Sequence, residues 1–260
     1  MAAHLLAHAR ISMHRMPALP EPVRPMTIEE GYRIQSELIP HLCVHFGGDV
    51  IGHKIACTNE IARKLLKADH PFSGHLLSGT THPSGASLDA SQFFMRVMEA
   101  EFAFQMASDL PPRSTPYTRE EIADAVAGVL PGIEIVDSRF GDWTTVGIPS
   151  LIADNDCHGA WVKGTLIKDW RSIDLAAQPV QLLVNGQIKG TGSGAAVLGH
   201  PLNALEWLVN SLNQRGVALE SGQYVTTGVT TDIYMAAPGD HVKADFGRVG
   251  AVEVTFHNGS

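Results

Sequence analysis

The chain has 260 residues, of which 44% are hydrophobic and 18% are charged, so it is long enough to bury a large core and is not of the disordered class. Nineteen basic residues against 27 acidic ones give a formal net charge of −8, which disfavours binding to nucleic acid. No apolar run reaches the length of a membrane span, no secretory signal is indicated, and three widely spaced cysteines predict reduced thiols in a cytoplasmic protein.

The first part of the chain favours helices. Thr27 and Glu30 form a capping box that begins one helix, and Gly47 ends it. A further short helix is expected to be capped by Thr58. Helices are therefore expected over residues 1–16, 27–46 and 58–67, with a strand over 49–55. These elements predict a small helical N-terminal part over residues 1–70.

From residue 71 to residue 260, short strands and turn residues dominate. Asn185-Gly186 between two apolar runs is a strong signal for a β-hairpin, and Pro201 and Gly216 mark the two ends of a helix. Strands are expected over residues 97–106, 132–137, 180–184, 187–191, 224–227, 241–246 and 249–256, with helices over 119–128 and 201–215. Because helices and strands do not alternate regularly, this pattern is typical of an α+β fold with a β-rich second part.

Two acidic residues stand two positions apart in an otherwise apolar strand. Glu99 and Glu101 would project from the same face of a strand, roughly 7 Å apart. Glu134 lies in a second apolar strand. Buried carboxylates repel one another unless a cation compensates them, and oxygen ligands suit Mg²⁺ or Mn²⁺. The spacing alone leaves open that Glu99 and Glu101 lie on the solvated face of an amphipathic strand.

Other candidates for chemistry carry weaker signals. Lys54 follows a β-like run, and composition alone favours a surface lysine there. His75 and His200 are candidate acid–base groups, although His200 is better explained as an anchor for the helix that begins at Pro201. The glycine-rich run 190–194 lacks the lysine of a phosphate-binding loop, and no Gly-x-Ser-x-Gly elbow occurs.

Short motifs in a fixed order along residues 27–256 carry a family resemblance. They are Gly52-His53-Lys54, Gly74-His75-Leu76, Glu99-Ala100-Glu101, Glu134-Ile135-Val136-Asp137, Ala153-Asp154-Asn155, Gly199-His200-Pro201, Thr227-Gly228 and Pro238-Gly239-Asp240. As a set they resemble the fumarylacetoacetate hydrolase superfamily and, within it, the branch of 2-keto-4-pentenoate hydratases and 4-oxalocrotonate decarboxylases. Glu rather than Asp at position 134 favours that branch.

The resemblance implies a mixed, barrel-like β-roll surrounded by helices, with residues 71–260 as the catalytic domain. It also implies a divalent metal, Mg²⁺ or Mn²⁺. The site residues that it implies are the metal ligands Glu99, Glu101 and Glu134, the catalytic Lys54, and the substrate-binding Asn155 and Thr227.

The activity implied is metal-dependent hydration of a small unsaturated 2-oxo acid in the degradation of aromatic compounds. A 4-oxalocrotonate-type decarboxylase and an acylpyruvate-type C–C hydrolase are the alternatives, and a non-catalytic partner subunit is an alternative of another class. The resemblance further implies a homo-oligomer, for which association with a pathway decarboxylase is one possibility. The acidic net charge and the lack of a long apolar run predict no contact with nucleic acid or membrane.

One departure concerns proton transfer. Several hydratases of the branch carry an Asp shortly after the Gly-x-Leu motif, whereas this chain has Ser78-Gly79-Thr80. His75 or a metal-bound water is expected to replace that acid.

Overall fold

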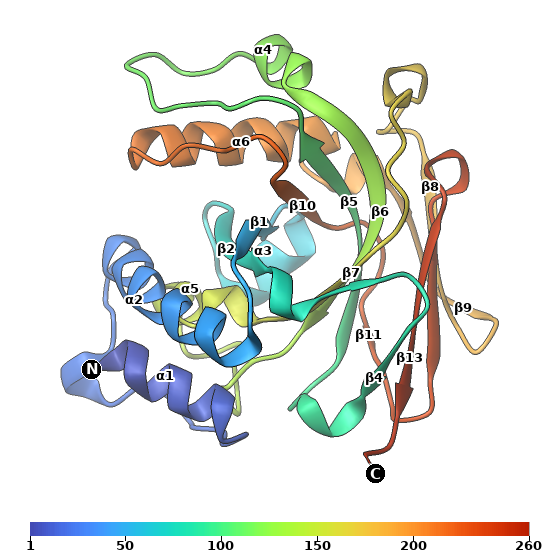
Figure 1. Ribbon diagram of the computed structural model, residues 1–260. Coiled ribbons are helices and arrows are strands. Elements are labelled where there is room, and N and C mark those ends of the chain that lie inside the picture. Colours follow the sequence, from blue (N-terminus) through green and yellow to red (C-terminus); the bar gives the residue numbers. More distant parts are fainter. Residues whose placement is uncertain (260) are drawn as a thin grey trace.

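The computed structural model describes residues 1–259 and contains two β-sheets flanked by helices (Figure 1). The helices are α1 (Ala2–Ile11), α2 (Ile28–Phe46), α3 (Glu60–Leu66), α4 (Arg119–Asp124), α5 (Ile148–Ala153) and α6 (Pro201–Gln214). The strands up to residue 163 are β1 (Val50–Ala56), β2 (Phe72–Leu77), β3 (Thr81–Pro83), β4 (Ala86–Asp89), β5 (Val97–Met106), β6 (Val126–Val136) and β7 (His158–Lys163). The later strands are β8 (Pro179–Val184), β9 (Gln187–Ser193), β10 (Tyr224–Val229), β11 (Tyr234–Met235), β12 (His241–Asp245) and β13 (Ala251–His257).

The larger sheet has eight strands in the order β2-β1-β10-β5-β6-β7-β3, with β11 paired to β5. The smaller sheet has five strands in the order β4-β13-β12-β8-β9. Both sheets mix parallel and antiparallel pairs, since β1 and β10 run parallel while β5 and β6 run antiparallel. This arrangement confirms the predicted α+β class.

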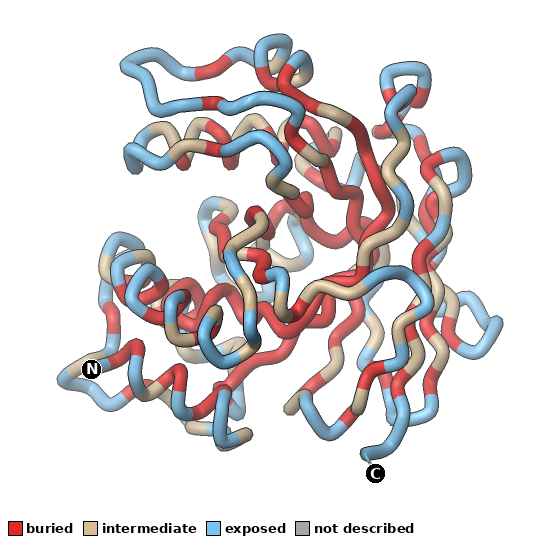
Figure 2. The backbone as a smooth tube through the Cα atoms, in the orientation of Figure 1, coloured by how far each residue is buried: buried red, intermediate tan, exposed pale blue. Residues whose placement is uncertain are grey.

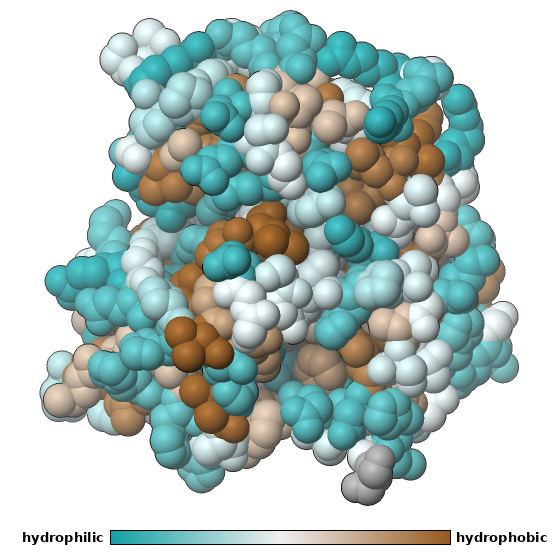
Figure 3. Space-filling view, viewed as in Figure 1, coloured by the Kyte–Doolittle hydropathy of each residue, from teal (hydrophilic) through white to brown (hydrophobic). Residues whose placement is uncertain are grey.

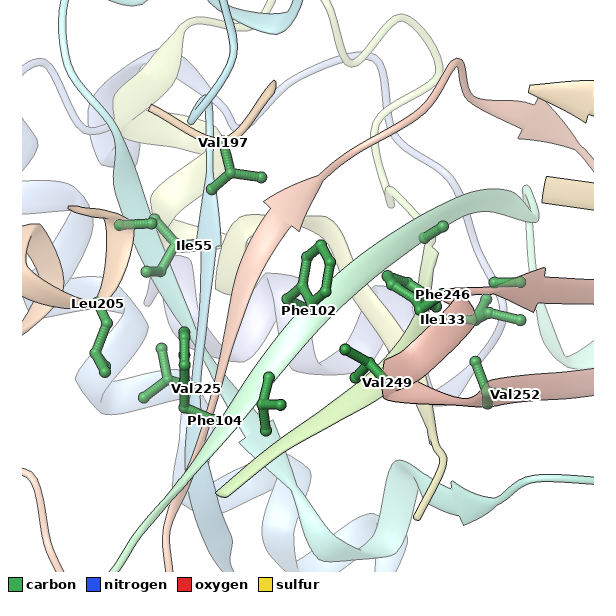
Figure 4. Packing of buried hydrophobic residues seen from close by; sticks show 14 of the residues in the cluster. Ile55, Phe102, Phe104, Ile133, Val197, Leu205, Val225, Phe246, Val249 and Val252 are labelled. Carbon is green, nitrogen blue, oxygen red and sulfur yellow. The ribbon is translucent and has the colours of Figure 1, made fainter. Parts of the chain in front are cut away.

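The main core lies between the two sheets. Side chains alternate along β5, so Met98, Phe102 and Phe104 enter the core while Glu99 and Glu101 project from the other face. Figure 4 shows Phe102 and its neighbours meeting residues of the smaller sheet and α6, which pack in one apolar cluster. The strand that carries the two acids is therefore fixed by the burial of its opposite face.

The helices near the N-terminus form a second apolar cluster. Leu6 of α1, Leu38 of α2 and Leu151 of α5 are buried there, and α1, α2 and α5 lie together in Figure 1. The buried stretches in Figure 2 follow this helical group and the long strands of the larger sheet. The surface seen in Figure 3 is mostly hydrophilic, with apolar side chains in small scattered patches. Within the described residues, no helix combines the length and apolarity needed to cross a membrane.

Most of the elements predicted from the sequence are present. The capping box of Thr27 and Glu30 forms as expected, and β5 has the predicted bounds. The hairpin turn at Asn185-Gly186 has positive φ at both residues, as a type I′ turn requires. The predicted boundary near residue 70 stays a prediction, although β1 precedes it and pairs with β10 in the larger sheet.

Three predicted elements are corrected at their ends. The first helix ends at Ile11 rather than residue 16, because the following turn brings Met16 beside Phe140 as an isolated bridge. The helix expected to reach residue 128 ends at Asp124, because the apolar, β-branched segment that follows pairs with β5 as the first half of β6. The cap of α3 is Asn59, not Thr58.

Candidate metal and substrate site

Three glutamates converge on the face of the larger sheet that points away from the main core. Glu99 and Glu101 stand two residues apart on β5, and Glu134 on β6 pairs in register with Glu99. One carboxylate oxygen of each lies within 4.8 Å of the others. Glu101 and Glu134 are fully buried, and Glu99 is half-buried. The structure thus brings together the three acids that the sequence predicts as metal ligands.

The donor set fits a hard divalent cation. Glu101 Oε2 accepts from the backbone N–H of Gly228 at 2.7 Å, and Glu134 Oε1 lies 3.0 Å from His158 Nδ1. The other oxygen of each of these two carboxylates is buried without a hydrogen-bond partner. Oxygen atoms left in this way suit Mg²⁺-like ions, which bind oxygen ligands.

Charge repulsion within the cluster is visible in the pKa values of the acids. Burial, followed by the charge of Glu134, raises the pKa of Glu99 to about 7. The same two causes raise the pKa of Glu101 well above its ordinary value. Burial also opposes ionisation of Glu134, but Lys54 and His158 together hold its pKa below the usual value. A cation would relieve this repulsion, since an opposite charge favours the ionised carboxylate.

Gly228 is placed by an irregularity in β10. The pairing of β10 with β5 shifts register between Thr226 and Val229, and Gly228 there has φ +97°. A Cβ at this position would clash with the side chain of Thr58, which is buried beneath it. Thr58 therefore packs against the bulge, and the next residue, Asn59, caps α3 by accepting from the N–H of Ala62. Glycine is required for the N–H to reach Glu101.

Lys54 joins the cluster, as the sequence resemblance implies. Its Nζ lies 3.3 Å from Glu134 Oε1 and 3.1 Å from Asp156 Oδ2, and it donates to the backbone oxygen of Asp156 at 2.9 Å. The side chain is buried. Burial opposes the charge, but Asp156 and Glu134 raise the pKa of Lys54 well above its usual value, so the ammonium group is charged.

His75 lies apart from the cluster. It pairs with His53, the residue before Lys54 on β1, and the two imidazole centroids are 5.0 Å apart. Because successive side chains on a strand alternate, this pair occupies the face opposite Lys54. The structure gives His75 no contact with the glutamates, and a catalytic role for it stays a prediction.

The side chains of Asn155 and Thr227 form hydrogen bonds with backbone groups. The Asn155 amide accepts from the N–H of His75 at 2.7 Å and donates to its carbonyl oxygen at 3.0 Å. The Thr227 hydroxyl donates to the carbonyl oxygen of Phe102 at 2.9 Å. Both side chains are buried, so substrate binding by either residue stays a prediction.

Sequence reasoning missed His158 and Asp156 as members of the site. Asn155, Asp156 and Cys157 all have positive φ, a conformation that Asn and Asp tolerate better than most residues. This left-handed run turns the chain so that Asp156 faces Lys54 and His158 begins β7 beside Glu134. The polar residues around position 156 are the only sequence signal for this turn.

A pocket of about 290 Å³ opens next to the cluster. Lys54, Glu99 and Asp156 line it on the buried side. On the exposed side, apolar side chains of α3 and of the segment before β11 line it, among them Ile61 and Ile233. The pocket therefore joins a charged inner end to an apolar mouth, a common form of small-molecule site.

Comparison with known proteins agrees with the motifs in the sequence. The family described as "Fumarylacetoacetate (FAA) hydrolase C-terminal" matches residues 77–257. A 2-hydroxyhexa-2,4-dienoate hydratase of Comamonas testosteroni is 35% identical over 233 residues, 89% of this chain and 87% of the relative. A 2-keto-4-pentenoate hydratase of Paraburkholderia xenovorans is 30% identical over 90% of this chain and 85% of its own. A 4-oxalocrotonate decarboxylase of Pseudomonas putida is 28% identical over 98% and 95%.

The fold agrees as well. The 4-oxalocrotonate decarboxylase from Pseudomonas putida G7, complexed with magnesium and adipate, superposes with a TM-score of 0.89 at 26% identity, covering 98% of this chain and 95% of that one. A second structure of that enzyme contains calcium and acetate. That decarboxylase thus holds a divalent cation and a carboxylate in both structures.

Proposed function

Because this chain belongs to the fumarylacetoacetate hydrolase family, we propose that it is a metal-dependent hydratase that adds water to a small unsaturated 2-oxo acid. The observation that carries the proposal is the buried cluster of three glutamates with Lys54 at the inner end of a pocket. Similarity to 2-hydroxydienoate and 2-keto-4-pentenoate hydratases supports hydration as the reaction, in the breakdown of aromatic compounds.

The residues of the cluster have different roles in the proposed reaction. Glu99, Glu101 and Glu134 would hold Mg²⁺ or Mn²⁺, which when bound supplies a Lewis acid for the carboxylate and 2-oxo oxygens of the substrate. Lys54, charged and buried, places an ammonium group where negative charge develops on the 2-oxo oxygen. His158 orients Glu134 through its hydrogen bond, and Gly228 fixes one oxygen of Glu101.

The pocket favours a substrate with one carboxylate and an apolar tail. Ile61, Leu65 and Ile233 line its exposed side, and no arginine or lysine apart from Lys54 lines it within the described residues. Asp232 also lies there and would repel a second carboxylate. We therefore expect 2-hydroxypenta-2,4-dienoate or its methyl homologue to be preferred over the dicarboxylate 4-oxalocrotonate.

A 4-oxalocrotonate-type decarboxylase is the second candidate, favoured by the structural similarity to the magnesium and adipate complex. A C–C hydrolase of acylpyruvate type is the third. We also propose that the protein is a cytoplasmic homo-oligomer and that it associates with a pathway decarboxylase, since relatives include both hydratases and decarboxylases.

The test is turnover of the two dienoates and of 4-oxalocrotonate, with and without Mg²⁺ or Mn²⁺. Loss of ultraviolet absorbance with a 4-hydroxy-2-oxo acid as the product, at a kcat/KM at least tenfold above that for 4-oxalocrotonate, is the expected result. Glu101→Ala should abolish it, because the variant removes a ligand. Release of CO₂ from 4-oxalocrotonate, without hydration of either dienoate, would show that the protein is a decarboxylase and not a hydratase.

A further inference from the structure

The pocket contains a carboxylate that the proposed site has not used. Asp156 is buried, lines the pocket, and lies with Oδ2 3.1 Å from Lys54 Nζ. Its backbone has φ 55°, between two neighbours that also have positive φ. Such left-handed backbone is strained for residues other than glycine, and strain of this kind gathers at functional sites. The turn holds the carboxylate at the wall of the pocket.

The partners of Asp156 differ from those of the other buried aspartates. Asp154 accepts from the side chain and the backbone N–H of Arg139. Asp137 accepts from Arg10 and from the backbone N–H of Met95.

Asp156 has only its ion pair with Lys54, and within the described residues its carboxylate accepts no other hydrogen bond. A carboxylate kept for structure alone is saturated, as Asp154 is. One that is left incomplete beside a pocket has oxygen free for a ligand or a water.

The Asp156 carboxylate shares the Lys54 ammonium group with other partners. Glu134 lies 3.3 Å from the ammonium group, and the backbone oxygen of Asp156 accepts from it at 2.9 Å. A second buried carboxylate beside one ammonium group adds a desolvation cost. Burial also raises the pKa of Asp156 well above its ordinary value, against the effect of Lys54. A carboxylate with a raised pKa is a stronger proton acceptor than an ordinary aspartate.

We propose that Asp156 is the proton-transfer carboxylate of the hydration, a claim that rests on the proposed function. The 2-hydroxy-2,4-dienoate first becomes the 2-oxo-3-enoate as the 2-hydroxyl proton leaves and C5 gains a proton. Asp156 then takes a proton from the water whose oxygen bonds to C4 of this 2-oxo-3-enoate. The electron pair of the C3=C4 bond moves toward C2, and that of the C2=O bond moves to the 2-oxo oxygen beside Lys54. The proton then passes from Asp156 to C3 as the C2=O bond re-forms. One water is consumed, and no oxidant or reductant is needed.

The experiment compares wild type with Asp156→Asn, which keeps the shape and removes the acid. We expect kcat for hydration of 2-hydroxypenta-2,4-dienoate to fall at least 100-fold, with KM and Mg²⁺ affinity changed less than threefold. Asp124→Asn, at an exposed aspartate paired with Arg171, is the matched control and should behave as wild type. Hydration by Asp156→Asn within threefold of wild type, or loss of Mg²⁺ binding together with activity, overturns the proposal.

Two further measurements separate chemistry from structure. Asp156→Ala should regain activity with added formate but not with formamide, since only formate restores a carboxylate; equal rescue by both would assign Asp156 a space-filling role. Exchange of the C3 protons of 2-oxopentanoate in D₂O tests Asp156 without hydration, because this acid has no double bond to hydrate. If wild type exchanges these protons but hydrates no dienoate, the proposed function is wrong while the role of Asp156 in proton transfer stands. Exchange by Asp156→Asn at the wild-type rate would remove the role of Asp156.

Discussion

At the scale of single residues, the buried acids of the site are less completely paired than Asp154, a buried acid away from the pocket. Arg139 and Asp154 form a buried pair that is joined by several hydrogen bonds and lies away from the pocket lining. Glu101 and Glu134 each keep one buried oxygen without a donor. Since unpaired buried oxygen costs free energy, these side chains are retained for what they bind rather than for stability.

The neighbouring histidines His53 and His75 predict how stability depends on pH. Burial lowers the pKa of His75 to about 4 and that of His53 well below its usual value. The unfolded chain therefore binds more protons than the folded one between about pH 4 and pH 6.5, and stability falls as the pH falls through this range. His75→Gln should remove up to about 3 kcal/mol of this loss.

Urea unfolding at pH 7 and at pH 4.5 measures the effect in both proteins. The difference in the free energy of unfolding between pH 7 and pH 4.5 should be smaller in His75→Gln than in wild type. His257→Gln, at an exposed histidine, serves as the control and should keep the wild-type difference. An unchanged difference in His75→Gln would mean that His75 is protonated in the folded protein.

At the scale of elements, β2 is an edge strand covered by side chains instead of a further strand. Gln35 donates to the carbonyl oxygen of Ser73, and the Tyr32 hydroxyl accepts from its N–H. Asn155 binds both backbone groups of His75. These contacts close an edge that would otherwise be open to pairing with other chains.

Asn155→Ala tests this role of Asn155. It leaves two buried backbone groups unpaired, so we expect a loss of about 2–6 kcal/mol in the free energy of unfolding, at ~1–3 kcal/mol for each group. Hydrogen exchange at the His75 amide should accelerate. KM should change less than threefold if the amide serves β2 alone, and a tenfold rise in KM with unchanged stability would instead support the predicted contact with substrate.

The apolar side chains of helix α3 face the pocket and are not buried in the core. None of its residues is buried, yet Ile61 and Leu65 line the pocket. The double variant Ile61→Ser, Leu65→Ser should raise KM for 2-hydroxyhexa-2,4-dienoate about tenfold, because the apolar tail loses its surroundings. The melting temperature should change little.

Steady-state kinetics and a thermal melt of the same sample decide the question. A matched control is Lys64→Ser on the same helix, whose side chain is 80% exposed and paired only with Glu60. A fall in melting temperature without a change in KM would make α3 a structural cover.

Across the whole molecule, the elements that could be predicted are those determined by a local sequence pattern. The β5 strand follows from its apolar pattern, and the hairpin follows from Asn185-Gly186. Side-chain alternation predicted only that Glu99 and Glu101 share a face, and the assignment of the three glutamates as metal ligands came from the family resemblance. Helix α5, β2 and β7 were missed because their short sequences carry no clear period. The position of Asp156 depends on three successive left-handed residues, a tertiary outcome that no pattern in one sequence specifies.

The metal and the pH are coupled through the whole fold, because the ligands come from strands that also form the sheet. Without metal, the raised pKa of Glu99, about 7, means that the folded protein binds more protons than the unfolded chain between about pH 4.5 and 7. Stability of the metal-free protein should therefore fall as the pH rises through this range. Mg²⁺ must displace this proton and any proton that the raised pKa of Glu101 keeps on that ligand, so its affinity should rise with pH through this range.

Thermal unfolding and titration calorimetry with and without Mg²⁺ at pH 6 and pH 8 give the comparison. One proton with a pKa of about 7 weakens Mg²⁺ binding roughly tenfold at pH 6, equal to about 1.4 kcal/mol at saturating ion. The rise in melting temperature on adding Mg²⁺ should accordingly be larger at pH 8. Glu99→Gln should bind Mg²⁺ weakly, with a smaller difference in affinity between the two pH values than in wild type. A pH-independent affinity in wild type would mean that Glu99 is already ionised at pH 6, and that Lys54 compensates the cluster without the metal.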